Sequence, residues 1–242
     1  MPETLTLLSA LFVVFCGALT QGLIGFGLAI VASPLLYLID PTMVPIPVLF
    51  MGFTIACLTL LKSKQHLAFK GLEFALLGRI PGGILGTVLL LVAPKPILGI
   101  AIGFIVVIAV GLNMLKLHCP INRLSLFIAG ILSGIFGNVA AIGGPPLAIL
   151  FANKEANQFR AALSAFFIFS SLISIAILAF AGLVTLAHIM TALLLLPAVL
   201  LGHVTAKKLA QHINKNHIRV ATHILCSVSA LIIIIESLIV LH

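Results

Sequence analysis

The stretch that decides the fold is QGLIGFGLAIVASPLL, residues 21–36, because a second stretch, SGIFGNVAAIGGPPLA at residues 133–148, repeats its glycines and prolines. Neither residue type suits the interior of a plain helix, yet both stretches lie within apolar sequence. Paired Gly/Pro breaks in the two halves of an apolar chain indicate a repeat-built membrane protein whose binding site lies at the breaks. The matched positions, at one constant offset of 112, are Gly22 and Gly134, Gly25 and Gly137, Pro34 and Pro146, and Leu35 and Leu147.

The composition indicates an all-α polytopic membrane protein. Of 242 residues, 62% are hydrophobic and 7% are charged, and the mean hydropathy is +1.35, whereas soluble domains are roughly 45–50% apolar. No stretch is polar enough for a separate soluble domain, so residues 1–242 are expected to form one transmembrane domain. The net charge of +8 comes from basic residues in short loops, which favours a positive-inside topology over nucleic-acid binding. Residues 1–3 lack the basic start of a signal peptide.

Six apolar segments are predicted to be ordinary transmembrane helices, since each is long enough to cross about 30 Å of hydrocarbon. Two further segments, about 5–40 and 124–153, contain the Gly/Pro breaks and are too long for one simple crossing. Each of these two either crosses once as a broken helix or folds back as a re-entrant hairpin. The six ordinary segments lie at about residues 43–61, 72–93, 97–115, 160–181, 184–206 and 218–241.

The loop charges favour the hairpins. With eight crossings, five basic loop residues face one side of the membrane and seven face the other, which is no bias. With six crossings and two hairpins, eleven face one side and only Lys95 faces the other. Because a Lys/Arg excess marks the cytoplasmic side, both termini are then extracytoplasmic. The eleven residues are Lys62, Lys64, Lys70, Lys116, Arg123, Lys154, Arg160, Lys207, Lys208, Lys215 and Arg219.

Each half then contains a broken re-entrant hairpin and three transmembrane helices. Because three crossings is an odd number, the halves are expected to be inverted repeats, with repeat one at about residues 5–116 and repeat two at about 124–242. Residues 81–86 and 197–202 both run from proline to glycine and give weaker support for the duplication. Non-helical backbone at membrane depth must be covered by protein or water, so both hairpin tips should meet at the repeat interface.

The tips are predicted to bind an anion, because the first N–H groups of a helix lack intrahelical partners and carry partial positive charge. Ser33–Pro34 has the pattern of an N-cap followed by proline at the first helical position, and the segment 144–146 repeats it. Two such half-helix N-termini would form an anion site at the midplane. The alternative is that the glycines only permit close helix packing. Whether residues 26–33 and 138–144 are helical or extended stays open.

Polar side chains near the breaks add candidates. Arg79 lies nine residues after Lys70, roughly 13 Å into its segment. It is either functional or snorkels to the interface, two readings of equal weight. Arg160 is rather expected to anchor the cytoplasmic side, and none of the five acidic residues lies near a tip. Asn138, Gln21 and Thr20 either donate to the substrate or satisfy freed backbone groups. The candidate substrate-binding residues are Gln21, Gly22, Gly25, Gly27, Ser33, Pro34, Arg79, Gly134, Gly137, Asn138, Gly143, Gly144, Pro145, Pro146 and Arg160.

The cysteines and histidines give no sign of metal chemistry. The four cysteines have no CxxC spacing, and the eight histidines show no ligand-like pairing. The chain also has no recognisable nucleophile–base pair. We therefore expect no metal, no cofactor and no enzymatic activity.

The chain resembles the TauE/SafE family, often called sulfite exporters or anion permeases. The resemblance rests on GLIGFG at residues 22–27 with Pro34-Leu35-Leu36, on GNVAAIGGPPL at residues 137–147, and on Arg160-Ala161. It covers essentially the whole chain. It implies a permease for small sulfur-containing anions such as sulfite, sulfoacetate or related sulfonates, with residues 143–146 as the signature segment and Arg160 beside it. The first break lacks the doubled glycine, so equal tips are not implied.

These features predict a secondary transporter of a small sulfur-containing or organic anion in a bacterial inner (plasma) membrane. An inside-negative potential favours exit of a monoanion by about 2.3 kcal/mol per 100 mV, so export needs no proton-relay carboxylate, whereas import needs coupling to H⁺ or Na⁺. The alternatives are a transporter of a neutral metabolite or cation, and a non-transporting membrane assembly factor, which predicts a dry, closed hairpin interface. The anion, the direction, the coupling ion and homo-oligomerisation stay open.

Overall fold

A computed structural model describes the chain except for residues 1–3, 26, 64–70, 115–118, 211–214 and 242. The basic loop residues Lys64, Lys70 and Lys116 therefore lie outside the described residues, and so do the side chains of Lys62 and Lys215. The elements of the described part are helices, which confirms the predicted all-α class. They are α1 (Thr4–Ile24), α2 (Leu28–Ile39), η1 (Pro41–Met43), α3 (Ile46–Ser63), α4 (Leu72–Val92), α5 (Lys95–Met114), α6 (Arg123–Ala140), α7 (Pro145–Phe151), α8 (Ala156–Phe180), α9 (Leu186–Leu209) and α10 (Lys215–Leu241).

Eight helices in the described part of the chain are long and apolar enough to cross a membrane. Six of them, α3, α4, α5, α8, α9 and α10, coincide with the predicted ordinary transmembrane segments. The other two, α1 and α6, are the long first arms of the two segments that contain the Gly/Pro breaks. The short helices α2 and α7 follow them. The protein is thus an integral membrane protein.

In the first interrupted segment the chain folds back on itself, so that α2 packs against α1. Gly17 makes this possible, because a Cβ atom there would lie 3.0 Å from the carbonyl oxygen of Leu28. The backbone N–H of Leu28 donates to Oε1 of Gln21 at 3.0 Å, which ties the start of α2 to α1. Between the two helices Gly25 and Gly27 have φ angles of 103° and 135°, a region open mainly to glycine. The break glycines therefore form a sharp bend.

The predicted N-cap at Ser33–Pro34 is wrong, because α2 begins at Leu28, six residues before Pro34, and residues 28–33 are helical. Pro34 lies inside the helix, where it has no N–H to donate to the carbonyl oxygen of Ile30. The thiol of Cys226 on α10 donates to that oxygen instead, at 3.2 Å. A neighbouring helix thus satisfies the group that proline leaves free, which is how such a residue is tolerated inside a buried helix.

The second interrupted segment also folds back, but its break is longer. Helix α6 ends at Ala140, Ala141 has a left-handed φ of 59°, and residues 141–144 are not helical. Helix α7 begins at Pro145 with Gly144 as its N-cap, as predicted. The hydroxyl of Ser133 donates to the carbonyl oxygen of Gly143 at 2.6 Å and holds the returning chain. Ser133 and Gln21 are matched positions of the two halves, so each half ties its returning arm at the same place.

Helix contacts occur in corresponding sets. Helix α4 packs along α6 as α1 packs along α9, and α3 pairs with α8 as α5 pairs with α10. Helix α2 contacts α10 as α7 contacts α5. Small residues allow the two tightest pairs: a Cβ at Gly82 would lie 2.1 Å from the carbonyl oxygen of Ile131, and one at Gly202 would lie 2.6 Å from that of Phe15. The close approach of α4 to α6 fixes the depth of every residue on α4.

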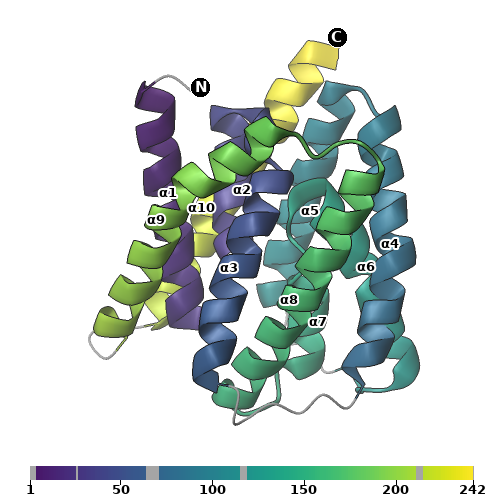
Figure 1. Ribbon diagram of the computed structural model, residues 1–242, viewed down its shortest axis with the longest axis vertical. Helices are drawn as coiled ribbons and strands as arrows, with labels where there is room; N and C mark the ends of the chain where they lie inside the picture. Colours follow the sequence, from purple (N-terminus) through teal and green to yellow (C-terminus); the bar gives the residue numbers. More distant parts are fainter. Residues whose placement is uncertain (1–3, 26, 64–70, 115–118, 211–214, 242) are drawn as a thin grey trace.

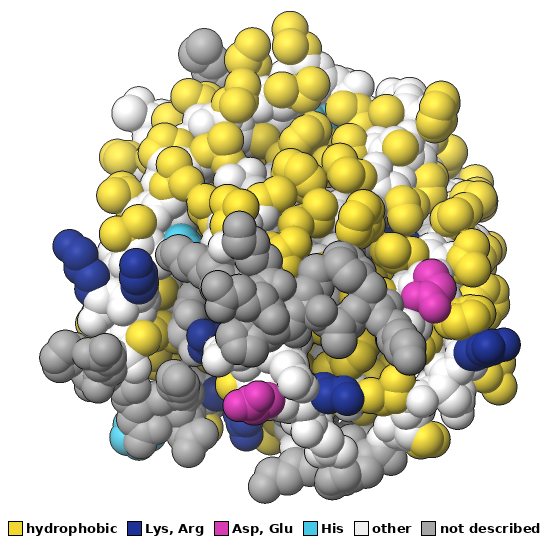
Figure 2. All heavy atoms as spheres, turned by 60° about the horizontal axis from the view of Figure 1, so that its bottom comes forward, with side chains coloured by type: hydrophobic (Ala, Val, Ile, Leu, Met, Phe, Trp, Pro, Cys, Tyr) yellow, Lys and Arg dark blue, Asp and Glu magenta, His cyan; other side chains and the backbone are white. Residues whose placement is uncertain are grey.

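The two ends of the bundle differ in charge. Helix α1 begins and α10 ends at the same end of the bundle (Figure 1). At that end, Tyr37 near the end of α2 donates to the carbonyl oxygen of Lys95 at the start of α5, at 3.4 Å. The opposite end, which we call the basic end, is where α9 ends and α10 begins, and it includes Lys207, Lys208 and Arg219. Figure 2 shows Lys and Arg side chains gathered around this end, with a mostly hydrophobic surface beyond it.

Candidate functional site

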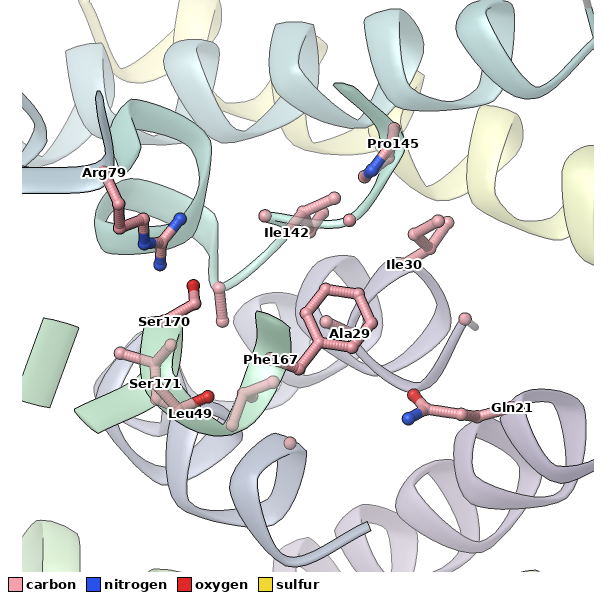
Figure 3. A pocket seen from close by; sticks show the side chains of 16 residues that line it. Gln21, Ala29, Ile30, Leu49, Arg79, Ile142, Pro145, Phe167, Ser170 and Ser171 are labelled. Carbon is pink, nitrogen blue, oxygen red and sulfur yellow. The ribbon is translucent and has the colours of Figure 1, made fainter. Parts of the chain in front are cut away.

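A cavity lies between the two breaks and is lined by both of them. Its volume is about 540 Å³, including the part that is open. We call it the central cavity. Figure 3 shows Arg79 and Gln21 on opposite sides of it, with Phe167 between them. It is lined by Gln21, Gly27, Ala29, Ile30, Val48, Leu49, Gly52, Arg79, Ala141, Ile142, Gly143, Gly144, Pro145, Phe167, Ser170 and Ser171.

Arg79 is the charged side chain on the wall of the central cavity. It is 1% exposed and ranks among the largest fully buried side chains of the described part. Its guanidinium therefore does not reach the membrane interface, and the snorkelling alternative is wrong. The reason is the packing of α4 against α6: glycines at the contact bring the helices so close that a Cβ at Gly137 would lie 2.2 Å from Nη2 of Arg79.

A chain of buried hydrogen bonds holds the guanidinium in place. Nη1 donates to the carbonyl oxygen and the hydroxyl of Ser133 on α6. Nη2 donates to the hydroxyl of Ser174 on α8 at 2.6 Å. That hydroxyl donates in turn to Oδ1 of Asn138 at 2.5 Å, and the Asn138 amide donates to Thr87 Oγ1 at 2.9 Å and to the Gly83 carbonyl oxygen at 3.0 Å. Three helices thus fix the position of one side chain.

The network leaves part of the guanidinium unused. Arg79 has five N–H donors, and three of them serve Ser133 and Ser174. Nε is buried and has no partner among the described residues. The Nε–H and one N–H of Nη2 are left for a further acceptor. These donors suit the oxygens of an oxyanion.

No carboxylate in the described part of the chain neutralises Arg79. Asp40, directly after α2, accepts hydrogen bonds from the backbone N–H and the hydroxyl of Thr42. Glu73 accepts a hydrogen bond from the backbone N–H of Gly71. Glu155 and Glu236 are exposed. An isolated buried charge is costly in a membrane protein, so such residues usually pair or serve a function. The described residues contain no group of three or more His, Cys, Asp or Glu that could hold a metal ion.

The helix starts at the two breaks offer fewer N–H groups than their sequences indicate. At α7 the first two residues are Pro145 and Pro146, which have no N–H, and the N–H of Leu147 bonds to the Gly144 carbonyl oxygen at 3.2 Å. At α2 the N–H of Leu28 is taken by Gln21. The next two residues of α2, Ala29 and Ile30, line the central cavity and lie in the first turn, where N–H groups have no helical partner.

Of the candidate residues, the structure brings six together on the wall of the central cavity: Gln21, Gly27, Arg79, Gly143, Gly144 and Pro145. Gly137 and Asn138 do not line it. Gly137 packs against the Arg79 guanidinium, and Asn138 accepts a hydrogen bond from the Ser174 hydroxyl. Ser33 and Pro34 lie inside α2 and Pro146 inside α7, and all three are buried away from the wall. Gly22 and Gly134 pack against α9 and α4, where an added Cβ would meet Ala206 at 2.4 Å and the backbone of Gly82 at 2.5 Å. For these two, the packing alternative describes the structure.

Arg160 lies at the first break without reaching the central cavity. Its Nη2 donates to the carbonyl oxygen of Leu23 at 3.0 Å, at the C-terminal end of α1. Its side chain packs on Gly25, where a Cβ would lie 2.9 Å from Cγ of Arg160. A cation at the end of α1 also interacts favourably with the helix dipole. Arg160 thus holds the bend between α1 and α2 from α8.

Sequence reasoning missed ten residues of the cavity wall, Phe167, Ser170 and Ser171 among them, and also Ser133 and Ser174 of the hydrogen-bond network. Three serines of α8 carried a usable signal. They recur at helical spacing within an otherwise apolar transmembrane segment and therefore mark one polar face. Ser170 and Ser171 lie on the cavity wall below Arg79 in Figure 3.

A protein-family model described as Sulfite exporter TauE/SafE matches residues 10–233. The chain belongs to this family. The resemblance drawn from GLIGFG, GGPPL and Arg160-Ala161 is therefore confirmed. Searches of curated proteins and of solved structures gave no match. TauE/SafE is a family of sulfite exporters and anion permeases, and eight apolar helices fit a transporter of this family.

Proposed function

We propose that this TauE/SafE protein is a secondary transporter that exports a small sulfur oxyanion, such as sulfite, sulfoacetate or a related sulfonate. The observation that carries the proposal is Arg79, a buried arginine on the wall of a cavity, without a carboxylate partner among the described residues. A cation in that position needs a counter-charge, and an anionic substrate supplies it. A cation substrate is disfavoured for the same reason.

The chemistry of the central cavity supports an oxyanion with a small apolar part. The unused donors of the guanidinium can bind oxyanion oxygens, for which a planar guanidinium is better suited than an ammonium. The hydroxyls of Ser170 and Ser171 are within the same cavity and can donate to a third oxygen. The rings and methyl groups of Phe167 and Ile142 can contact an alkyl group. The N–H groups at the start of α2 and at residues 143–144 add positive partial charge, although the two prolines of α7 make this contribution smaller than the arginine's.

The proposal includes the membrane topology. Each broken segment would be a re-entrant hairpin, and the halves, at about residues 5–116 and 124–242, would be inverted repeats. The corresponding helix contacts and the return of α2 along α1 support this arrangement. With Lys and Arg gathered at the basic end (Figure 2), that end would be cytoplasmic in a bacterial inner membrane and both termini extracytoplasmic.

Export follows from the charge of the substrate. A monoanion leaving an inside-negative cell gains about 2.3 kcal/mol per 100 mV, so the transporter can run without a coupling ion. Import would need H⁺ or Na⁺, and the acidic residues of the described part lie away from the central cavity. A non-transporting assembly factor would need no cavity between the hairpins, so the central cavity also favours transport over that alternative.

Thermal unfolding in detergent against a panel of sulfur anions tests the proposal. Sulfite or an alkyl sulfonate should raise the Tm of the wild type, and proteoliposomes should take up the same anion. Arg79→Gln should lose both effects. Arg123→Gln is the matched control, because Arg123 is an exposed arginine that packs on the Phe74 ring at 5.3 Å, away from the central cavity. Failure of every anion in the panel to stabilise the wild type, together with no uptake, would refute the proposal.

A further inference from the structure

A second cavity lies between the first bend, α5 and α10, near the basic end. Its volume is about 270 Å³, including the part that is open. The C-terminal part of α5 supplies Asn113, and the N-terminal part of α10 supplies Arg219, Thr222 and His223. None of its lining residues is acidic. We call it the basic-end cavity.

The two cavities share a wall. Gly27 and Ile30 line both of them, so the two spaces adjoin at these residues. Gly27 has no side chain to thicken the wall, and its φ of 135° is one that other residues rarely adopt. The carbonyl oxygen of Ile30 is held by the thiol of Cys226 on α10, the helix that also lines the basic-end cavity. A path between the two cavities would therefore run past Gly27 and Ile30.

The chemistry of the basic-end cavity suits an anion. Arg219 and His223 are four residues apart on α10, so both lie on the same helix face. The Arg219 guanidinium adds a permanent positive charge, and the Thr222 hydroxyl adds a donor. A cavity lined by one sign of charge raises the local concentration of the opposite ion.

We propose that the basic-end cavity is an access site where the transported anion waits before it passes Gly27 and Ile30 to reach Arg79. The site takes the same chemical class as the central cavity, a small sulfur oxyanion, and the inference rests on the proposed function. Arg219 is the residue that attracts the anion, and it acts on the rate of loading rather than on the occupied central site.

Thiol labelling tests the access site without measuring transport. Thr222→Cys is made in a variant in which the native cysteines are replaced by serine. The serine at position 226 keeps a hydroxyl that can donate to the carbonyl oxygen of Ile30. In proteoliposomes, a small anionic thiosulfonate reagent applied to the basic end should react faster with Cys at 222 than a cationic one of similar size. Adding Arg219→Gln should lower the ratio of the two rates by roughly tenfold, because one charge a few ångströms away is lost. Arg123→Gln should leave the ratio unchanged.

Transport supplies the second readout. Arg219→Gln should raise the KM for the anion on the basic side several-fold with little change in kcat. A bulky thiol reagent attached to Cys at position 222 should block transport, whereas the same reagent attached to Val220→Cys, a position 56% exposed on the surface of α10, should not.

The outcomes separate the two proposals. If the ratio of the two labelling rates is the same with and without Arg219→Gln, or if Cys at position 222 does not react, the access site is refuted. The proposal for the central cavity is unaffected by either result. Loss of anion stabilisation in Arg79→Gln with an unchanged labelling ratio is the expected pattern if both proposals hold. If no anion stabilises the wild type, the proposed function fails, and the access site fails with it.

Discussion

Replacing Arg79 with methionine is predicted to remove anion binding without destabilising the anion-free protein. Methionine is also long and unbranched and can fill the space of the arginine stem. The two serines that accept from Arg79 keep other bonds: the Ser133 hydroxyl donates to Gly143, and the Ser174 hydroxyl donates to Asn138. The variant therefore leaves both serine hydroxyls with a hydrogen-bond acceptor. It also removes a charge that has no carboxylate partner in the described part of the chain.

The magnitudes follow from these contacts. Replacing buried ionic groups with apolar ones of similar volume is often neutral or stabilising by about 1–4 kcal/mol. For Arg79→Met we expect a stabilisation of about 0–2 kcal/mol, at the lower end of this range, because the hydrogen bonds made by the guanidinium are lost. For a chain of this size, about 2–4 °C per kcal/mol gives a Tm between that of the wild type and about 8 °C higher. At one hundred times its Kd, an anion should stabilise the wild type by about 2.7 kcal/mol and the variant not at all.

The assay is thermal unfolding with gluconate as the buffer anion, with and without an alkyl sulfonate. Arg123→Met is the control, since an exposed arginine should change stability by only about 0.5 kcal/mol. Two results would contradict the reasoning. One is an anion-free Arg79→Met protein less stable than wild type by more than about 2 kcal/mol, because Arg79 would then be a structural residue. The other is unchanged stabilisation by the sulfonate.

Three further predictions concern the glycines and the topology. Gly137→Ala should fold but lose anion-dependent stabilisation, since its Cβ would lie 2.2 Å from the buried guanidinium, whereas Gly52→Ala, on the cavity wall with nothing within 4 Å of its Cβ, should keep it. Gly134→Ala should lower the yield of folded protein on gel filtration, because its Cβ would meet the backbone of α4 at 2.5 Å; a wild-type elution profile and Tm would show that the helices can separate. Cysteines placed at Lys208 and Lys95 should label from the cytoplasmic and the outer side respectively, and labelling of both from one side would contradict the re-entrant hairpins.

The sequence was sufficient for the features that depend on local pattern. Apolar length predicted the six ordinary transmembrane helices, and the matched glycines located both bends. The start of α7 was also predicted correctly, because proline at the first helical position costs no hydrogen bond. These features need only the residues within a few turns of themselves.

The start of α2 was not predictable in the same way. Local pattern favoured a start at Pro34, yet the helix continues through it, because Cys226, 196 residues away from Ile30, donates to the freed carbonyl oxygen. The partners of Arg79 were hidden for a similar reason. Ser133 and Ser174 come from two other helices, 54 and 95 residues along the chain, and only packing brings them to the guanidinium. The position of Arg79 along its helix could be predicted from the sequence, but the burial of its side chain could not.

The duplication places one charge, and not two, at the central cavity. The proline-to-glycine match between residues 81–86 and 197–202 pairs Arg79 with Leu195, which is fully buried and apolar. The two halves therefore share their helix contacts but differ in the residue that carries the charge. A monoanion beside a single guanidinium leaves the occupied site neutral, whereas a dianion leaves a net negative charge in a buried place, which is costly.

From this asymmetry we predict a preference for monoanions. An alkyl sulfonate should bind at least about tenfold more tightly than sulfate, a difference of about 1.4 kcal/mol in binding free energy. Sulfoacetate, with a second charge on its carboxylate, should fall between them, because the N–H groups at the start of α2 can meet that charge only in part. Isothermal titration of the detergent-solubilised protein measures all three. Tighter binding of sulfate than of the alkyl sulfonate would show that a second positive group faces the anion, and Arg79 would then not be the sole counter-charge of the site.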